Sequence, residues 1–377
     1  MRLFRTCLLL LTAVILPGCL GTAAPSTAPT PAPAATPTAS PTAPATRRFP
    51  PTATLSADAD FLEKPPASLR VMTYNVNWDS IFPEDDPENH DLRAFDREDS
   101  FRRILQAIRP DVLCLQEVND RRRARDLAEF VEAALGAPQG DAWQVAHVRD
   151  DVIASRFGLL VEGYELVTGS VLYYLDQAAA LVDLPDRDYG PTDLYVICSH
   201  FASGGGLDDI LLRARQADVV MRHVRDLETS GGNLDLLSGA PFVILGDFNA
   251  YDSDPARHLR TLTQGDIYDQ TAYGMDFDPD WDGTALRDAR PSLNGQGIHF
   301  YTWRNDGEPF APWALDRVIF SDSVLQVENA FVLDTMLLGQ ETLDVYGLRR
   351  EDVLLDRASG NYDHLPVVVD FQAGPRR

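Results

Sequence analysis

An acid and an amide stand two residues apart at the end of one apolar run. Residues 242–249 read FVILGDFN, so Asp247 and Asn249 follow a short hydrophobic stretch that ends at Gly246. The run predicts a short buried strand, and alternation along a strand places Asp247 and Asn249 on the same side. A carboxylate beside a neutral amide is suited to hold a water molecule, a metal-bound oxygen or a phosphate oxygen. The same residues are also compatible with a structural turn, because Asp and Asn bond to nearby backbone.

Polar residues of the same few kinds lie at or beside the ends of other apolar runs. They are Asn75, Glu117, His200, Asp316, Asp363 and His364. Each has a structural explanation by itself, as a turn former, a surface acid or a packed histidine, but that explanation does not predict the repetition. Oxygen-rich ligands suit Mg²⁺, whereas His and Asp serve in proton transfer and charge stabilisation. The pattern therefore favours one site that combines a metal ion with acid–base groups.

Hydrophobic periodicity predicts the elements that must position these residues. Apolar runs predict strands over residues 69–77, 112–118, 143–147, 152–155, 193–201, 242–249, 299–303, 313–320 and 365–371. Apolar residues at helical spacing predict helices over residues 101–108, 121–135 and 210–227. Gly136 is a suitable C-terminal cap for the second helix, and residues 253–255, Ser-Asp-Pro, predict the start of a further helix.

Six short motifs, taken in order along the chain, resemble the endonuclease/exonuclease/phosphatase superfamily. They are Tyr74-Asn75-Val76, Leu115-Gln116-Glu117-Val118, Ser199-His200-Phe201, Gly246-Asp247-Phe248-Asn249, Leu315-Asp316-Arg317-Val318-Ile319-Phe320 and Asp363-His364-Leu365-Pro366-Val367. Each motif alone is weak, but six in the family's order span nearly all of residues 68–371. The resemblance implies an α+β fold, a four-layer α/β/β/α sandwich in which two mixed β-sheets pack face to face with helices outside.

The resemblance also implies how the site would bind a metal ion. Glu117 would be the principal Mg²⁺ ligand, with Asn75 beside it and Asp363 acting through water; Mn²⁺ and Ca²⁺ are the alternative ions. Asp247 would orient or deprotonate the attacking water, and Asn249 would hold a phosphate oxygen.

The two histidines have implied roles in charge stabilisation and proton transfer. His200 would hydrogen-bond the phosphoryl group or protonate the leaving oxygen. Asp316 would pair with His364, fix its tautomer and favour its charged form, so that His364 acts as a base or as a cationic stabiliser. The chemistry common to the family is an in-line displacement at phosphorus.

Two features of the sequence bear on the branch of the superfamily that the chain resembles and on its substrate. Some members carry an Arg or Tyr on the strand before the His200 strand, whereas residues 177–182 here read QAAALV, which departs from the deoxyribonuclease and apurinic-endonuclease branches. His299, Trp303 and Trp313 lie near the predicted site strands, where they would either shape a substrate pocket or simply pack as buried aromatics.

The N-terminus has the pattern of an export signal. Arg2 and Arg5 precede a short apolar run, and Cys19 follows at a position that resembles the lipobox of bacterial lipoproteins. We expect a signal peptide over residues 1–18, lipidation of Cys19, an Ala/Pro/Thr-rich disordered linker over residues 19–67, and one catalytic domain over residues 68–373. Cleavage at another position and a plain secretory signal are the two alternatives.

The charge balance limits the partners. The chain has 33 basic and 57 acidic residues, a formal net charge of −24. Duplex binding without sequence preference depends on Lys and Arg that neutralise phosphates, and the only basic tract is the short run 121–123. This disfavours a structural nucleic-acid binder, although an acidic enzyme can still cleave nucleic acid. A monomer is expected, in contact with the membrane through a lipid anchor only.

The two cysteines of the domain lie inside apolar runs. An exported protein with only Cys114 and Cys198 in its body has no disulfide framework, so both are predicted to act as small buried hydrophobes. A bridge between neighbouring strands is the less favoured alternative.

These observations predict an exported Mg²⁺-dependent hydrolase of phosphate esters, displayed on the cell surface or secreted. Its substrate would be a nucleic acid, a lipid head group or a small molecule, and the sequence does not choose between a diester and a monoester. The alternative is a catalytically inactive binding module on the same scaffold.

Overall fold

Two β-sheets face each other in the structure, a computed structural model that describes residues 59–77, 80–81, 96–118, 123–138, 142–161, 177–232, 234–251, 257–297 and 300–373. The chain divides into two units, Met1–Pro50 and Pro51–Arg377, and every described residue lies in the second. Cys19, His299 and the capping residues 253–255 lie outside the described residues.

The first sheet has seven strands. Their order across the sheet is β10 (Ser292–Leu293), β12 (Leu325–Val332), β13 (Val367–Ala373), β1 (Leu69–Asn75), β2 (Val112–Gln116), β4 (Asp151–Ser155) and β3 (Gln144–Val148). Strands β1 and β2 are parallel, and β13 runs antiparallel to β1. The sheet is therefore mixed, as predicted.

The second sheet has six strands, and it is mixed as well. Their order is β5 (Gly158–Val161), β6 (Ala178–Asp183), β7 (Leu194–His200), β8 (Phe242–Asp247), β11 (Asp316–Phe320) and β9 (Arg287–Asp288). Strands β7 and β8 are parallel, whereas β11 is antiparallel to β8.

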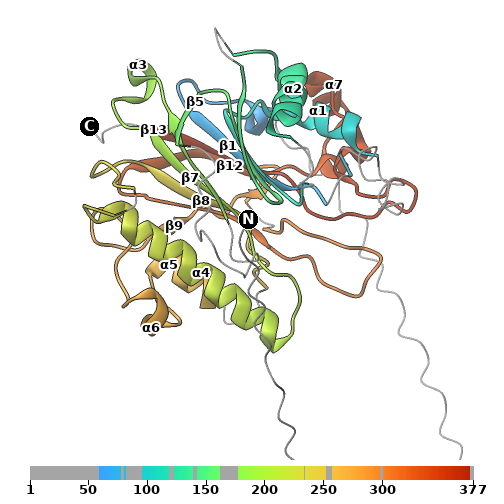
Figure 1. Cartoon of the computed structure of the whole chain (residues 1–377). Coiled ribbons are helices and arrows are strands. Elements are labelled where there is room, and N and C mark those ends of the chain that lie inside the picture. The colour runs from blue at the N-terminus through green and yellow to red at the C-terminus, as the bar shows by residue number, and fades with distance from the viewer. Residues whose placement is uncertain are drawn as a thin grey trace, which may run out of the picture. The chain divides into compact units, whose positions relative to one another are not determined.

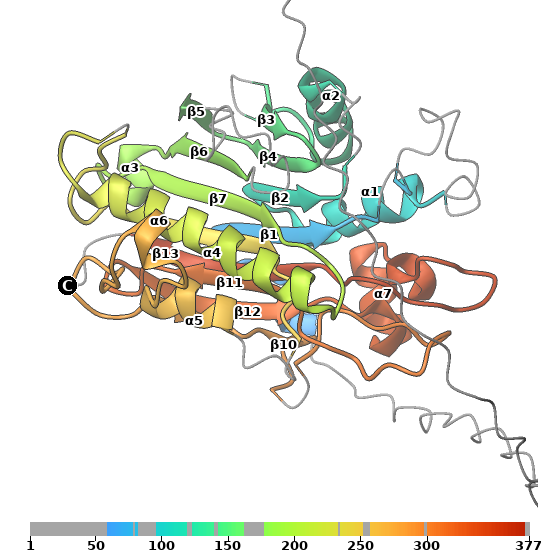
Figure 2. The ribbon, with the colours of Figure 1, turned by 60° about the horizontal axis from the view of Figure 1, so that its bottom comes forward.

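Helices form the two outer layers. In Figure 1 the layers follow one another from α1 (Glu98–Ile108), α2 (Ala124–Leu135) and α7 (Gln340–Tyr346), through the two sheets, to α4 (Leu207–Glu228), α5 (Arg257–Gln264) and α6 (Gln270–Tyr273). Figure 2 shows α4 and α5 running along the six-stranded sheet. The short helices are η1 (Ala59–Leu62), α3 (Asp186–Tyr189), η4 (Thr335–Leu337) and η5 (Arg350–Val353). The predicted four-layer α/β/β/α sandwich is confirmed.

Burial on both faces explains the near-continuous apolar strands. On β8, Val243 and Leu245 belong to the core that includes residues of both sheets, whereas Phe242 and Ile244 belong to a second core shared with α4. Because successive side chains alternate between faces, this strand must be apolar at nearly every position until it reaches its end. The first polar side chain then emerges at Asp247.

Some element predictions differ from the structure. Residues 300–303 form no strand; Trp303 makes only isolated bridges to Trp313 and His364. Strands β9, β10 and β12 were not predicted, because two are very short and β12 mixes apolar residues with exposed polar ones. Phe61 and Leu62, which lie within the predicted linker, are buried in the core. Two apolar residues in a Pro-rich stretch are too few to produce a periodic signal.

The prediction for the cysteines was wrong. Cys114 on β2 and Cys198 on β7 form a disulfide, with their Cα atoms 5.7 Å apart. The two strands are neighbours across the sandwich, one from each sheet, so no sequence pattern along either strand reveals the pairing.

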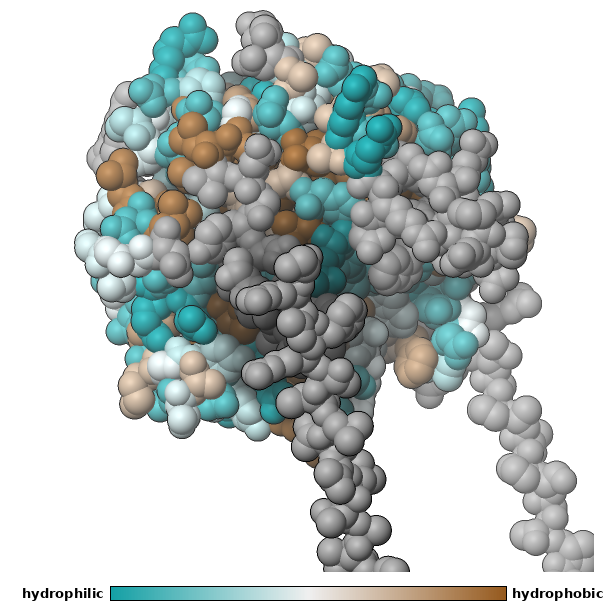
Figure 3. Space-filling view, in the orientation of Figure 1, coloured by the Kyte–Doolittle hydropathy of each residue, from teal (hydrophilic) through white to brown (hydrophobic). Residues whose placement is uncertain are grey.

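The surface shown in Figure 3 is largely hydrophilic, with hydrophobic residues in smaller groups between polar ones. Large exposed hydrophobic side chains among the described residues belong to separate segments; examples are Leu160, Leu207, Met275 and Phe310. Within the described ranges, the structure contains no helix whose length and hydrophobicity would let it cross a bilayer.

Candidate active site

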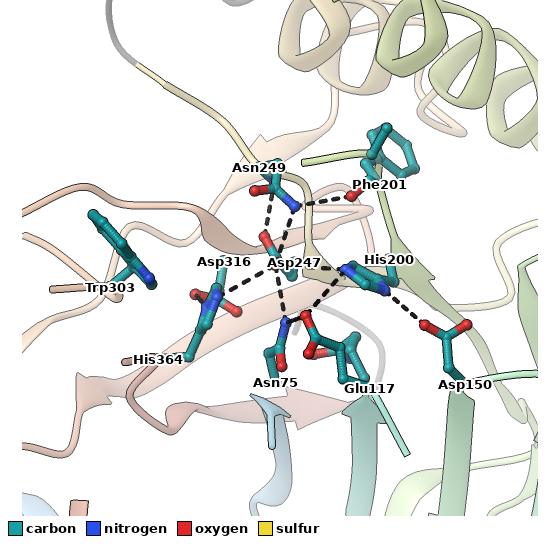
Figure 4. Close-up of polar contacts among 12 residues, drawn as sticks. Asn75, Glu117, Asp150, His200, Phe201, Asp247, Asn249, Trp303, Asp316 and His364 are labelled. Carbon is teal, nitrogen blue, oxygen red and sulfur yellow. Dashed lines mark hydrogen bonds and ion pairs between the residues drawn. The ribbon is translucent and has the colours of Figure 1, made fainter. Parts of the chain in front are cut away.

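Strand register brings the predicted site residues to one end of the sandwich. On the seven-stranded sheet, the parallel pair β1–β2 ends with Asn75 opposite Gln116, directly before Glu117. On the six-stranded sheet, β7–β8 ends with His200 opposite Asp247, and Asp247 also pairs with Asp316 at the start of β11. Figure 4 shows that the side chains from both sheets point toward one another.

Asp247 lies at the centre of this group. Its Oδ2 atom accepts hydrogen bonds from Asn75 Nδ2 at 3.1 Å and from Asn249 Nδ2 at 3.2 Å, and its Oδ1 atom accepts one from the Asn249 backbone N–H at 2.8 Å. Asn249 Nδ2 also donates to the Phe201 carbonyl at 2.8 Å. Asp247 is 1% exposed, so this buried carboxylate is held by donors from both sheets.

The backbone around these residues is adapted to the site. A Cβ atom on Gly246 would lie 1.9 Å from the Ser199 carbonyl oxygen, so only glycine allows β7 and β8 to approach here. Glu117 and Asn249 have φ of 57° and 47°, which is uncommon for residues other than glycine. Such conformations concentrate at functional sites, where the surrounding structure holds them.

The side chain of Glu117, directly after β2, is held by a hydrogen bond from the end of β1: Asn75 Nδ2 donates to Glu117 Oε1 at 2.9 Å. Burial raises the pKa of Glu117, while His200 and the Asn75 hydrogen bond oppose that rise. Its side chain is nevertheless 17% exposed, which leaves the carboxylate within reach of a ligand from solvent.

His200 is paired with a residue that the sequence analysis did not identify. Its Nδ1 atom lies 2.8 Å from Asp150 Oδ2, and its Nε2 atom lies 3.6 Å from Glu117 Oε1 and 3.9 Å from Asp247 Oδ2. Burial by itself would lower the pKa of His200, but the hydrogen bond to Asp150 and the charge of Glu117 outweigh it and raise the pKa to about 10. His200 is therefore a cation at neutral pH in the metal-free protein.

His364 forms a second histidine–carboxylate pair. Its Nδ1 atom lies 2.9 Å from Asp316 Oδ2, and its Nε2 atom lies 3.5 Å from Asp247 Oδ2. Thr302 Oγ1 donates to Asp316 Oδ2 at 2.6 Å and so fixes that carboxylate. Burial opposes the charged form of His364, but Asp316 and Asp247 raise its pKa well above the usual value.

Asp363 lies at the edge of the group, and both of its carboxylate oxygens already accept hydrogen bonds. Its Oδ1 atom accepts from Trp303 Nε1 at 3.0 Å, and its Oδ2 atom accepts from Asn77 Nδ2 at 2.7 Å. Trp303 and Trp313 are half-buried, so they are neither fully packed core residues nor freely exposed ones. The ligand role predicted for Asp363 stays a prediction.

Two sets of residues could hold a metal ion. Asp247, Asp316 and His364 bring potential ligand atoms within 4.8 Å of one another. In this set Asp316 Oδ1 is buried without a hydrogen bond, whereas both oxygens of Asp247 already accept hydrogen bonds from amides. The second set centres on Glu117, whose carboxylate is partly exposed and carries one hydrogen bond from Asn75. Hard oxygen donors of this kind fit Mg²⁺.

The exposure of the side chains defines the open side of the site. Glu117 and His200 are each 17% exposed and Asp150 is 26% exposed, whereas Asp316 and His364 are 0% and 7% exposed. The site is therefore open next to Glu117 and His200, whereas Asn249 and His364 lie on its buried side.

The chain matches the model of a known family over most of its length. The model of the endonuclease/exonuclease/phosphatase family matches residues 72–335, which is most of the 377-residue chain. The chain belongs to this family. It is therefore a phosphoesterase, and the polar residues at the ends of β1, β2, β7 and β8 are the candidates for its active site. No curated protein sequence matches the chain.

Several solved structures are similar to this chain at low sequence identity. An endonuclease/exonuclease/phosphatase from Bacteroides vulgatus is 15% identical, with a TM-score of 0.49 over 81% of this chain and 99% of that one. The human Nocturnin catalytic domain with bound sulfate is 17% identical, with a TM-score of 0.47 over 82% and 96% of the two chains. D. rerio TDP2 with a single-strand DNA product is 15% identical, with a TM-score of 0.48 over 81% and 98%.

Sequence reasoning missed three residues that contact the predicted site. Asp150 pairs with His200, Thr302 with Asp316, and Asn77 with Asp363. Asp150 belongs to the Asp-Asp pair that directly precedes the predicted strand 152–155, so a search for acids at strand starts as well as strand ends would have found it. Asn77 ends the predicted strand 69–77, two residues after Asn75, so the same search for polar groups at strand ends would have found it. Thr302 carried no comparable signal.

Proposed function

We propose that this phosphoesterase hydrolyses its substrates with Mg²⁺ bound at Glu117, and that it works outside the cytoplasm, held at the cell surface through Cys19. The observation that carries the catalytic part is the convergence of two histidine–carboxylate pairs on one buried aspartate. His200 Nε2 and His364 Nε2 lie 3.9 Å and 3.5 Å from Asp247 Oδ2. Two cations beside a fixed carboxylate suit a dianionic transition state at phosphorus together with an activated water.

Asp247 and Asn249 would act on the two reacting partners. Asp247 is held by three hydrogen bonds, so it can orient the attacking water and accept its proton without moving. Asn249 would donate to a phosphate oxygen with the amide that now contacts Asp247 Oδ2 and the Phe201 carbonyl. Because the amide has only two N–H hydrogens, donation to the phosphate would replace one of these two contacts.

The histidines would neutralise the charge of the phosphoryl group. His200 lies on the open side and would hydrogen-bond the phosphoryl oxygens or protonate the leaving oxygen. His364, fixed by Asp316, would stabilise charge from the buried side. Their pairing with carboxylates keeps both rings oriented and charged.

The metal ion would supply electrostatic stabilisation of the phosphoryl oxygens. Glu117 would be its principal ligand, with Asn75 beside it and Asp363 acting through water. Mn²⁺ and Ca²⁺ are the alternatives.

Two observations support export. The N-terminal residues have the pattern of a lipoprotein signal that ends at Cys19. The described domain also contains the Cys114–Cys198 disulfide, and stable disulfides occur mainly in proteins of oxidising compartments. Metabolic labelling with a radioactive fatty acid tests the anchor: Cys19→Ala should abolish incorporation, and unchanged labelling would refute it.

A panel of substrates tests the catalytic proposal. Bis-p-nitrophenyl phosphate, p-nitrophenyl phosphate, plasmid DNA, sphingomyelin and inositol phosphates are each incubated with the protein in Mg²⁺ and in EDTA. We expect hydrolysis of at least one phosphate ester that EDTA abolishes. Hydrolysis that is equally fast in EDTA, or in a Glu117→Ala variant, would refute the metal assignment.

The rival hypothesis is an inactive surface binding module on the same scaffold. A protein that had lost catalysis would be expected to have lost at least one of the predicted site residues. Glu117, His200, Asp247 and His364 are all present and lie together. Titration calorimetry separates the two hypotheses, because an inactive module need not bind Mg²⁺ or Mn²⁺.

A further inference from the structure

A single disulfide joins the two β-sheets within the described structure. Cys114 on β2 belongs to the seven-stranded sheet and Cys198 on β7 to the six-stranded sheet, and both are fully buried. The bridge lies between the layers rather than within one, so it sets how far apart β2 and β7 can move.

The bridge lies directly behind two residues of the active site. Cys114 precedes Glu117 by three residues, and Cys198 precedes His200 by two. At ~3.3 Å per residue along a strand, each sulfur is within roughly 10 Å of the side chain that it supports. Glu117 Oε1 and His200 Nε2, which face each other 3.6 Å apart across the two sheets, therefore lie on the strands that the disulfide ties together.

Gln116 connects the sulfurs to the site. Its Nε2 atom lies 2.8 Å from Cys114 Sγ and 3.3 Å from Cys198 Sγ, and its side chain is buried. The Gln116 carbonyl accepts the Val76 N–H at 3.0 Å, and Gln116 pairs with Asn75 in the β1–β2 register. The residue between the bridge and Glu117 thus contacts both sulfurs and supports the strand end that carries Asn75.

The opposite end of the sandwich is held differently. There Phe320 on β11 and Phe371 on β13 pack across the sheets, with ring centroids 5.0 Å apart. Apolar contacts of this kind are non-directional and adjust to small shifts. At the site end the facing side chains are polar, among them Asn75, Asp247 and His200, so apolar packing cannot set the separation there.

We propose that the Cys114–Cys198 disulfide positions the metal site: it holds the strand ends that carry Asn75 and Glu117 in place against the six-stranded sheet, and its loss weakens metal binding beyond what lost stability explains. Cys114 and Cys198 are positioning residues, because neither touches the substrate. The inference rests on the proposed Mg²⁺ site at Glu117.

Two variants of the mature chain separate positioning from simple stabilisation. Cys114→Ala/Cys198→Ala removes the bridge behind the site. Phe371→Leu loosens the sheet interface at the far end and serves as the matched control for general destabilisation. Mg²⁺ and Mn²⁺ affinities are measured by titration calorimetry at a temperature at which circular dichroism shows each variant folded.

We expect the double-cysteine variant to bind Mg²⁺ at least about 10-fold more weakly than wild type, the size of effect seen when groups that orient metal ligands are removed. Phe371→Leu should lower the melting temperature yet keep the Mg²⁺ affinity within about twofold, a difference of about 0.4 kcal/mol. Equal Mg²⁺ affinity in the double-cysteine variant and wild type would overturn the proposal. So would an equal loss of affinity in both variants.

Reduction of the wild-type protein provides a second test if the double variant does not fold. A water-soluble phosphine delivers two electrons, water supplies the oxygen of the resulting phosphine oxide, and two protons complete the two thiols. A thiol count confirms reduction, and circular dichroism confirms that the chain stays folded. Weaker Mg²⁺ binding after reduction, restored by reoxidation, supports the proposal, and unchanged binding overturns it.

The readouts distinguish this inference from the proposed function. If the oxidised wild type binds Mg²⁺ but hydrolyses no phosphate ester, the catalytic proposal fails, and the affinity comparison still decides the role of the bridge. If the wild type hydrolyses esters and the double-cysteine variant does so with an unchanged Mg²⁺ requirement, only the positioning role fails.

Discussion

Asp150 holds His200 in its place: Oδ2 of the carboxylate lies 2.8 Å from Nδ1 of the ring. Asp150 lies in the turn between β3 and β4 of the seven-stranded sheet, whereas His200 ends β7 of the other sheet. The contact fixes the ring so that Nε2 faces Glu117 and Asp247. The pair mirrors Asp316 and His364 on the other side of Asp247, as Figure 4 shows.

Asp150→Asn should change the pH dependence of catalysis. The carboxylate is a main cause of the raised pKa of His200, so its loss lowers that pKa from about 10. If protonated His200 is the active form, the alkaline limb of the rate profile moves to lower pH. Profiles of kcat/KM between pH 6 and 10 check this. Asp150→Glu should restore part of the shift, and a profile identical to wild type in Asp150→Asn would contradict it.

Glu117→Gln should weaken metal binding without destabilising the metal-free protein. Burial raises the pKa of Glu117 although the charge of His200 opposes that rise, so the ionised form costs free energy when no metal ion is bound, and a neutral amide removes that cost. Wild type should gain thermal stability as Mg²⁺ is added, following mass action, while Glu117→Gln should gain little. Glu129→Gln, at a residue that is 61% exposed on α2, is the control and should respond to Mg²⁺ as wild type does.

Asn249→Ala should lower kcat by about 10²–10³-fold, the usual loss for one preplaced donor to a developing charge. KM should change much less, because the donor acts mainly in the transition state. Initial rates at saturating Mg²⁺ measure both constants. The variant also removes a donor to Asp247, so circular dichroism must show a native fold. A loss below about 10-fold would argue against contact between Asn249 and the reacting phosphate.

Asn75→Asp should destabilise the metal-free protein. Asn75 is 1% exposed and donates to Glu117 and to Asp247, so an aspartate would bring a third carboxylate against two others. The free energy of unfolding in EDTA should fall by about 1–3 kcal/mol or more, and Mg²⁺ should recover part of it. Gln264→Glu, the same change on an exposed residue, should cost less than about 0.5 kcal/mol. Equal losses in the two variants would contradict the proposed geometry.

The stability of the metal-free protein should fall as the pH rises from 6.5 to about 10. Folded His200 keeps its proton up to a pKa of about 10, whereas the unfolded value is 6.5. The folded state thus binds more protons in this window, so the contribution is complete below pH 6.5 and is lost toward pH 10, with a slope of up to about 1.4 kcal/mol per pH unit.

Urea unfolding in EDTA across this pH range measures the slope. His200→Gln should reduce the slope, because glutamine does not titrate, but it should not abolish the slope, because the raised pKa of His364 acts in the same direction. A slope that is unchanged in this variant would assign the effect to other groups.

The sequence by itself determined most of the strands and the chemistry at their ends. Apolar runs that end at Asn75, His200 or Asp247 can be read locally, because a strand buried on both faces must be apolar until it reaches the site. The ordered motifs, compared with the family, also indicated the pairing of Asp316 with His364, which the structure places 2.9 Å apart.

Only the tertiary structure decided which residues meet across the two sheets. The Cys114–Cys198 bridge, the contact of Asp150 with His200 and the burial of Phe61 all join segments that are distant in sequence. The periodicity of a strand shows which face is buried, but it carries no information on the register between facing sheets. That register follows from the packing of the whole core, and with it the distances on which the chemistry of the site depends.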